Sequence, residues 1–403
     1  MIKKIIYKYK IKFFGTIFIL SIVYFCLISL DWCVKVYVNM NKLKPIKEAE
    51  KIEKDYKKKI PAKAQKKRDQ GFSPMFSPSY FNKKKEYNSL YKKYSTLPLG
   101  VLPNKKYYVC DEGYGLTTFT SDKFGFWNPN KIYNKNVDIM IIGDSLSMNG
   151  CLQEEETFIG MLRKNYNVMN LSISANDPIH YASVAKVFIP EFKPKIVLMV
   201  FNRGDFIDHY SQKTHIYKEN FFEKKVAYFE DEKNFLNFPE KYNKNLVNLL
   251  FDAQDITEKY IGRFNDFNPA EQVSKLHRIF ILFSTHYKLT YLQNIFLNKN
   301  YLPYGNELAL DELSKNCDKI NCSAFYAFVP GSNFWRPDSR QSKYSELLGG
   351  ANKKFNNLKF INFTDDFKNL DKDAYSPKGN HLSKTGNKKI FKKLTIHFNE
   401  TEF

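Results

Sequence analysis

Short apolar runs alternate along the second part of the chain with segments in which apolar residues recur every three or four positions. Short runs of this kind are typical of strands buried on both faces of a parallel sheet. We predict strands at Val137–Ile142, Val168–Ile173, Lys195–Phe201, Ala324–Val329 and Leu358–Phe363. The longer periodicity predicts helices at Glu154–Arg163, Ile179–Phe188, Glu307–Lys315, Ser342–Lys354 and Lys384–Leu394. This alternation predicts an α/β fold with a parallel sheet of about five strands between helices.

A longer apolar run near the amino terminus has a different meaning. Phe13 to Leu30 is free of charge and is about 27 Å long as a helix, at roughly 1.5 Å per residue. Lysines precede it in residues 1–12, and Trp32 follows at the expected far interface. We therefore predict a cytoplasmic basic tail at 1–12 and a transmembrane signal anchor at 13–32. A cleaved signal peptide is the alternative, but no small-x-small cleavage site follows.

A large domain after a first anchor helix usually crosses the membrane. We therefore expect a single-pass membrane protein with its bulk outside the cytoplasm, in the periplasm if the cell is Gram-negative. The net charge of +21 is concentrated before this domain, because residues 34–108 hold twenty Lys and Arg against six Asp and Glu. We predict a Lys-rich stalk and lead-in segment at 33–119, followed by a globular domain at 120–403. Residues 210–300 interrupt the strand–helix pattern, and we interpret them as a mainly helical insertion.

Other compositional features narrow the function classes. The basic region lies next to the predicted membrane span and carries no nucleic-acid motif, so nucleic-acid binding is disfavoured. The seven His are scattered, without His-x-x-x-His or Cys-x-x-Cys spacing, and we expect neither a metal nor another cofactor. In an oxidising compartment a bridge between Cys317 and Cys322 is one interpretation, and free thiols are the other. The sequence leaves the oligomeric state open.

Polar residues follow the predicted strands at four places. Ser145 follows the first strand, "NLSISANDP" (170–178) contains the end of the second, "FNRGDFIDH" (201–209) follows the third, and "SPKGNHLSKTG" (376–386) follows the last. Functional groups of open parallel sheets collect at the carboxyl ends of the strands, so we expect these stretches to converge. Ser145 alone is equally well interpreted as a nucleophile or as the cap of the next helix.

Together these blocks resemble the SGNH or GDSL hydrolases. "IMIIGDSLSMNGCLQEEETFIGMLRK" (139–164) is similar to the family's strand, Gly-Asp-Ser elbow and following helix, and "GNHLSKTG" (379–386) to its histidine block. "SDKFGFWN" (121–128) is similar to a segment found in membrane-anchored, polysaccharide-associated members. The resemblance implies a flavodoxin-like three-layer fold and a serine nucleophile that cleaves or transfers acyl esters. Such an enzyme needs no cofactor.

The resemblance also implies roles for individual residues. Ser145 matches the nucleophile and His381 the catalytic base. The second block normally has a Gly whose N–H helps to bind the oxyanion, and Ala175 stands there. The third block normally reads Gly-x-Asn-Asp; here Gly204 precedes Asp205, and Asn202 or Arg203 are possible substitutes for the missing Asn donor. Ala175, Gly204 and Asn202 are therefore the candidate oxyanion donors.

The last block departs further from the family pattern. The family has an Asp three residues before the histidine, and this chain has Lys378. Asp373 or Asp371 are candidate replacements, a backbone carbonyl is another, and a degraded site is the third interpretation. We therefore expect an extracytoplasmic SGNH-type esterase or acyltransferase, acting on acylated carbohydrate or another ester, with cell-envelope or exported polysaccharide as the expected carrier. The alternative is a catalytically degraded module that binds glycan or acts as a scaffold.

Overall fold

The computed structural model describes residues 16, 18–30, 33, 44–78, 81, 85–94, 97–207, 244–261, 302–333 and 340–400. The chain divides into two compact units. The first comprises Met1–Lys47 with Arg263–Asn300, and the second comprises Glu48–Gly262 with Tyr301–Phe403. The predicted sheet and all the predicted site residues belong to the second unit.

The second unit is built on a parallel sheet of five strands. They are β4 (Ile139–Ile142), β5 (Val168–Asn170), β6 (Ile196–Asn202), β7 (Ser323–Val329) and β8 (Leu358–Asn362). All five predicted strands are present, and the spatial order is β5-β4-β6-β7-β8. Ile139 pairs with Val168 on one side and with Ile196 on the other. The direction of the strand order therefore changes between β4 and β6, which is the place where open sheets of this kind bind their ligands.

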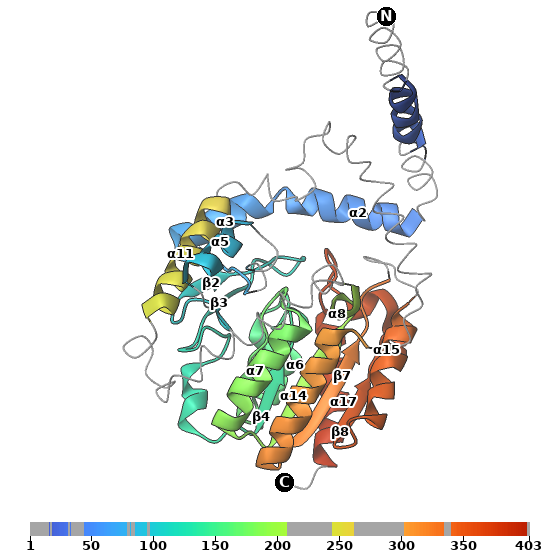
Figure 1. The fold of residues 1–403 in the computed structure, drawn as a ribbon. Coiled ribbons are helices and arrows are strands. Elements are labelled where there is room, and N and C mark those ends of the chain that lie inside the picture. The colour runs from blue at the N-terminus through green and yellow to red at the C-terminus, as the bar shows by residue number, and fades with distance from the viewer. Residues whose placement is uncertain are drawn as a thin grey trace, which may run out of the picture. The chain divides into compact units, whose positions relative to one another are not determined.

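Helices cover both faces of this sheet, so it is the middle of three layers. Alternate side chains of β4 enter opposite cores: Met140 and Ile142 enter one, and Ile139 and Ile141 the other. The first core is closed by α7 (Pro178–Phe192), α14 (Tyr304–Ile320) and α15 (Gln341–Gly350). The second is closed by α6 (Phe158–Leu162), α16 (Thr364–Leu370) and α17 (Lys384–Asn399). Figure 1 shows α7 and α14 side by side over the sheet. The predicted helices are all found, although the first is interrupted after η2 (Glu154–Glu156).

Two helices that border the site begin at side-chain caps. The Asp177 carboxylate accepts a hydrogen bond from the His180 N–H, and Pro178 occupies the first turn of α7. The Ser383 hydroxyl accepts from the Gly386 N–H at the start of α17. Such caps satisfy backbone donors that the helix leaves unpaired, and they fix where the preceding loop ends.

Much of the predicted stalk and lead-in segment at 33–119 packs into the unit that contains the sheet. From Glu48 onwards it belongs to the same compact unit as the sheet, because apolar residues spaced among the lysines, such as Phe76, Phe81 and Tyr107, are fully buried in the first core. Its elements are α2 (Lys44–Lys57), α3 (Ile60–Asp69), α5 (Lys85–Tyr94) and a small sheet of β1 (Ser73–Pro74), β2 (Lys106–Tyr108) and β3 (Thr118–Thr120). Strand β2 runs parallel to β1 and antiparallel to β3.

Part of the predicted insertion at 210–300 is described. Residues 244–261 form helix α11 (Lys244–Ile261), which packs against α5 and β1 of the lead-in segment. The rest of the predicted insertion lies outside the described residues. Shorter elements complete the unit: η1 (Asn130–Asn134), α8 (Gly204–Ile207), η4 (Ala351–Lys353) and η5 (Asp371–Ala374).

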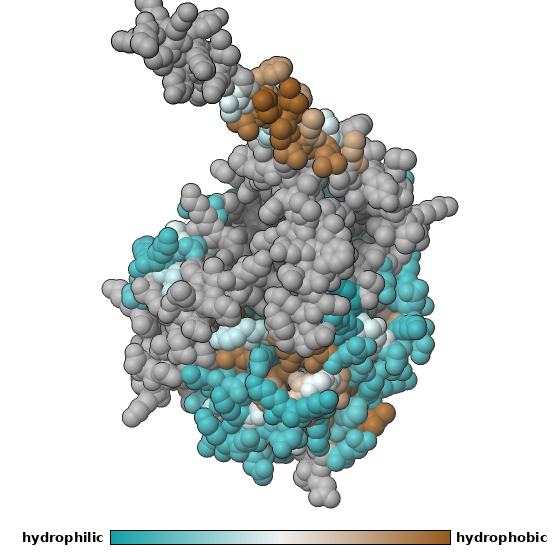
Figure 2. Space-filling model, turned by 45° about the vertical axis from the view of Figure 1, so that its right-hand side comes forward, coloured by the Kyte–Doolittle hydropathy of each residue, from teal (hydrophilic) through white to brown (hydrophobic). Residues whose placement is uncertain are grey.

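The predicted anchor at 13–32 lies only partly within the described residues. Residues 18–30 are helical, and large apolar side chains are exposed along them, Phe25 to 72% and Phe18 to 67%. Figure 2 shows these side chains gathered in one brown surface. Within the described part of the chain, no helix is both long enough and apolar enough to span a membrane.

Candidate active site

Ser145 lies in a tight turn directly after β4. The Asp144 carboxylate accepts from the Leu146 N–H at 2.9 Å, and the Gly150 N–H donates to the Ser145 carbonyl at 2.9 Å. No helix starts at Ser145; the next α-helix begins at Phe158 and is capped by Thr157. Ser145 is therefore not a helix cap, and the other interpretation, a nucleophile, stays a prediction.

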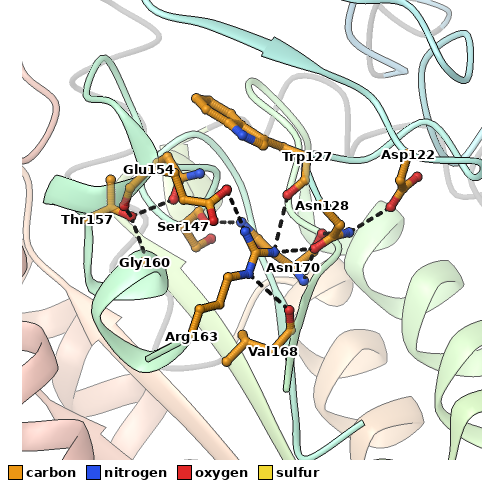
Figure 3. Close-up of polar contacts among 11 residues, drawn as sticks. Asp122, Trp127, Asn128, Ser147, Glu154, Thr157, Gly160, Arg163, Val168 and Asn170 are labelled. Carbon is orange, nitrogen blue, oxygen red and sulfur yellow. Dashed lines mark hydrogen bonds and ion pairs between the residues drawn. The ribbon is translucent and has the colours of Figure 1, made fainter. Parts of the chain in front are cut away.

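A buried polar network connects this turn to β5 and to the segment 121–128 (Figure 3). The Asn170 side chain donates to the Ser147 carbonyl at 2.8 Å, and the Asn128 side chain makes two hydrogen bonds to the backbone of Asn170, at 2.8 and 2.9 Å. Asp122 accepts from Asn128 at 2.8 Å, and Arg163 donates to the same Asn128 side chain. Burial raises the pKa of Asp122, while hydrogen bonds from Tyr133, Phe126 and Asn128 oppose that rise. The "SDKFGFWN" segment thus supports the turn that contains Ser145.

His381 occupies the loop before α17, where it meets a carboxylate that the sequence analysis did not predict. The Nδ1 atom of His381 lies 2.8 Å from Oε1 of Glu112, and the His381 backbone N–H donates to Oε2 at 2.9 Å. The side chains are 18% and 13% exposed, respectively. A carboxylate on Nδ1 keeps the proton of the neutral ring on that nitrogen and leaves the Nε2 lone pair to accept a proton.

The charge state of Glu112 suits this role. Burial raises its pKa, but the charge of His381, hydrogen bonds from the His381 ring and backbone, and one from the Asn380 backbone outweigh burial and leave the pKa below its usual value. Glu112 is therefore ionised at neutral pH. An ionised carboxylate stabilises the imidazolium that forms when a histidine acts as a general base.

Two glycines allow these groups to approach each other. A side chain at Gly379 would overlap the carboxylate of Glu112, and a Cβ at Gly150 would lie 3.1 Å from Cβ of His381. Gly150 also closes the Ser145 turn through its N–H. His381 therefore packs against the turn that contains Ser145.

Glu112 occupies the position that we assigned to Asp373 or Asp371. Asp373 is exposed, and its backbone carbonyl accepts from the Ser383 hydroxyl at 2.5 Å. Asp371 is also exposed. Lys378, which stands where the family has Asp, contacts Glu112 through the backbone: its N–H donates to the Glu112 carbonyl at 3.0 Å. Glu112 therefore supplies the carboxylate that the histidine block itself lacks.

Two of the three predicted oxyanion donors remain available. Ala175 is exposed in a turn after β5, and its φ of 64° is the left-handed conformation that a glycine adopts readily. Among the described residues, its N–H has no hydrogen-bond acceptor. The prediction for Gly204 is corrected, because its N–H already donates to Oδ1 of Asn202 at 2.6 Å.

This hydrogen bond orients the side-chain amide of Asn202. Its Oδ1 is used by Gly204, and its Nδ2 is buried without a partner in the part of the chain that the structure describes. Burial raises the pKa of Asp144, while the hydrogen bond from the Leu146 N–H, the charge of His381 and the nearby Asn202 amide oppose that rise. Asp205 accepts from the Asn202 backbone N–H at 2.7 Å and from the Tyr181 hydroxyl at 3.0 Å. Burial and the nearby charge of Asp144 raise the Asp205 pKa well above its usual value.

Two disulfides are present in the described part of the chain. One joins Cys317 to Cys322, as one of our two interpretations had it, and the other joins Cys110 to Cys151. Among the described residues, the one cluster of His, Cys, Asp and Glu close enough to hold a metal is Cys110, Cys151 and His381. Both of its sulfur atoms are used by the disulfide, whereas zinc is bound by thiolates.

The arrangement has the parts of a site for acyl transfer. Ser145 lies in the turn after β4, and the Nδ1 atom of His381 is hydrogen-bonded to Glu112. The Ala175 N–H and the Asn202 amide, two candidate hydrogen-bond donors, lie at the ends of β5 and β6, the strands on either side of β4. No protein-family model matches this chain, and no match was found among curated protein sequences. The function is therefore argued from the residues themselves.

Proposed function

We propose that this chain is a membrane-anchored, extracytoplasmic serine esterase or acyltransferase of the SGNH type. The observation that carries the proposal is the hydrogen bond from His381 to Glu112, beside the turn that holds Ser145. The order of strands supports it, because placing the second strand outside the first is the flavodoxin-like arrangement. The alternative, a catalytically degraded module, was motivated by the absence of the family's Asp and Asn. Glu112 and Asn202 supply the same chemical groups, a carboxylate and an amide, which favours the enzyme.

The proposed reaction proceeds through an acyl-enzyme. Ser145 Oγ attacks the ester carbonyl while His381 accepts its proton, and Glu112 stabilises the imidazolium. The Ala175 N–H and the Asn202 amide donate to the oxyanion of the tetrahedral intermediate. The imidazolium returns the proton to the leaving alcohol, and water or a sugar hydroxyl then removes the acyl group by the same steps in reverse.

The proposed location rests on the amino-terminal residues. The helix over 18–30 exposes large apolar side chains, and a chain of this kind is stabilised by burying them in lipid. The basic residues in 1–12 favour the cytoplasmic side for the preceding tail. The proposed substrate, an acyl ester of cell-envelope or exported polysaccharide, rests on the resemblance of "SDKFGFWN" and the Ser145 block to polysaccharide-associated SGNH proteins.

Covalent labelling tests the nucleophile. The full chain, purified in detergent, is treated with a fluorophosphonate probe and compared with Ser145→Ala and Ser147→Ala. Ser147 is the matched control because it lies in the same turn and is fully buried. We expect labelling and hydrolysis of p-nitrophenyl acetate by the wild type and by Ser147→Ala, and neither by Ser145→Ala. Equal labelling of the wild type and Ser145→Ala, or no labelling and no hydrolysis by the wild type, would contradict the proposal.

A further inference from the structure

Glu112 reaches His381 from a segment that is distant in sequence. It lies in the loop of the β2–β3 hairpin, which two hydrogen bonds close: Val109 N–H to the Thr117 carbonyl and Thr117 N–H to the Cys110 carbonyl, both 2.9 Å. These bonds fix the base of the loop. They do not fix the loop relative to His381, which belongs to the loop before α17, the last helix.

The disulfide joins the Glu112 loop covalently to the turn against which His381 packs. Cys110 precedes Glu112 by two residues, and Cys151 directly follows Gly150, on which His381 rests. Sγ of Cys151 lies 3.4 Å from Nδ1 of His381, and Sγ of Cys110 lies 3.4 Å from the Gly150 carbonyl. The bridge therefore joins the loop that carries the carboxylate to the turn that carries the nucleophile, and it contacts the imidazole between them.

A second anchor holds the same loop from the other side. Asp111 is buried and accepts from Lys63 at 2.5 Å, from Tyr56 at 2.7 Å, and from the Gly113 and Gly115 N–H groups at 3.0 and 3.1 Å. This anchor ties the loop to helices of the lead-in segment and makes no contact with His381. We therefore expect the loop to stay folded without the disulfide, so that the change is confined to the fit between Glu112 and His381.

We propose that the Cys110–Cys151 disulfide is a positioning crosslink of the active site, which holds Glu112 against His381 so that the site is fully assembled only in the oxidised chain. The proposal rests on the proposed serine-esterase function for its kinetic readout. The disulfide takes no part in bond making or breaking in the ester reaction.

Kinetics on p-nitrophenyl acetate test this role with a matched control. Cys110→Ala/Cys151→Ala is compared with Cys317→Ala/Cys322→Ala, which removes the other bridge. That bridge lies at the amino end of β7, whereas the candidate site lies at the carboxyl ends of the strands. At a temperature where both remain folded, we expect kcat to fall about 10- to 100-fold in the first variant and to stay within about twofold in the second. KM should change little in either. An unchanged kcat in Cys110→Ala/Cys151→Ala overturns the proposal.

A variant cycle shows whether the bridge acts through Glu112. If it does, adding Cys110→Ala/Cys151→Ala to Glu112→Gln lowers kcat by less than about threefold further. If the two losses multiply, the bridge acts elsewhere and the proposal fails.

Reduction tests the same role without a substitution at the bridge. In the Cys317→Ala/Cys322→Ala chain, a dithiol reagent supplies two electrons and two protons to the remaining bridge and closes to its own cyclic disulfide. Turnover should fall on reduction and return on reoxidation.

A spectroscopic readout separates this proposal from the proposed function. The Nδ1–H proton of His381, assigned with His381→Gln, should be shifted downfield and protected from exchange in the wild type and in Cys317→Ala/Cys322→Ala. It should lose both properties in Cys110→Ala/Cys151→Ala. If the wild type shows no Ser145-dependent turnover, the esterase proposal fails, and this resonance alone decides the positioning role. Its persistence without the Cys110–Cys151 bridge overturns that role.

Discussion

Replacing Gly379 by Ala tests the Glu112–His381 pair without changing either residue. The new Cβ would overlap Cδ and Oε1 of Glu112, and the carboxylate must retreat by more than about 1 Å to reach ordinary contact. The 2.8 Å hydrogen bond to Nδ1 would then approach about 4 Å and no longer exist. A displacement of this size in a catalytic group lowers turnover about 100-fold, equivalent to about 2.7 kcal/mol of activation free energy.

Stability should change little in this variant, because the overlapping atoms are at the end of a side chain that can move. The assay is kcat for p-nitrophenyl acetate, with thermal unfolding measured in parallel. Gly350→Ala is the control, since a Cβ there meets no atom within 4 Å, and it should keep wild-type turnover.

A second substitution makes the reasoning stricter. Glu112→Asp shortens the acid by one methylene, so it should lower kcat in the otherwise wild-type chain. In the Gly379→Ala chain the shorter side chain avoids the new methyl group, so Glu112→Asp should lower kcat little further or raise it. Wild-type kcat in a folded Gly379→Ala chain would refute the role of Glu112. So would a Glu112→Asp loss of equal size in both backgrounds.

Three further expectations concern the oxyanion side of the site. Ala175→Gly should raise the free energy of unfolding by about 1 kcal/mol in urea titrations, because a non-glycine residue in the left-handed region is strained, and it should keep turnover; a destabilised variant would contradict this. Asn202→Ala should lower kcat about 10²- to 10³-fold with a small change in KM, and near-normal kcat would exclude it as a donor. Asp205 has a raised pKa, so its contribution to stability is fully present below the unfolded-state pKa and is lost as pH rises from there through the folded-state pKa. Asp205→Asn should therefore gain melting temperature relative to the wild type as pH rises from about 5 to 9, and parallel curves would contradict the assignment.

The strands were predictable because their signals are local. An apolar run such as Ile139–Ile142 must be buried on both faces, and this fixes its place in the middle of a parallel sheet. Ser145 and His381 were assigned from the resemblance of their stretches to two SGNH blocks, and both stretches lie at strand ends. These predictions need no knowledge of which segments meet.

Glu112 was not predictable in this way, because it meets His381 across 269 positions of sequence. Nothing in "CDEGYG" (110–115) distinguishes its two acids from those of an ordinary polar loop. The one available signal was the cysteine: pairing Cys110 with Cys151, close after Ser145 in the chain, would have placed Asp111 and Glu112 at the site. Pairings among cysteines cannot be deduced from sequence alone, and we placed this segment in the lead-in before the globular domain.

The same geometry explains why Lys378 is compatible with the proposed role of His381 as a general base. The imidazole needs one carboxylate on Nδ1, and its direction of approach matters more than its place in the chain. Glu112 fills that direction, and Gly379 leaves room for it beside the ring. Residue 378 then contributes its backbone N–H, which pairs with the Glu112 carbonyl and holds the two segments together. A side chain that would be harmful as a replacement for the acid is therefore harmless once the acid comes from the β2–β3 hairpin.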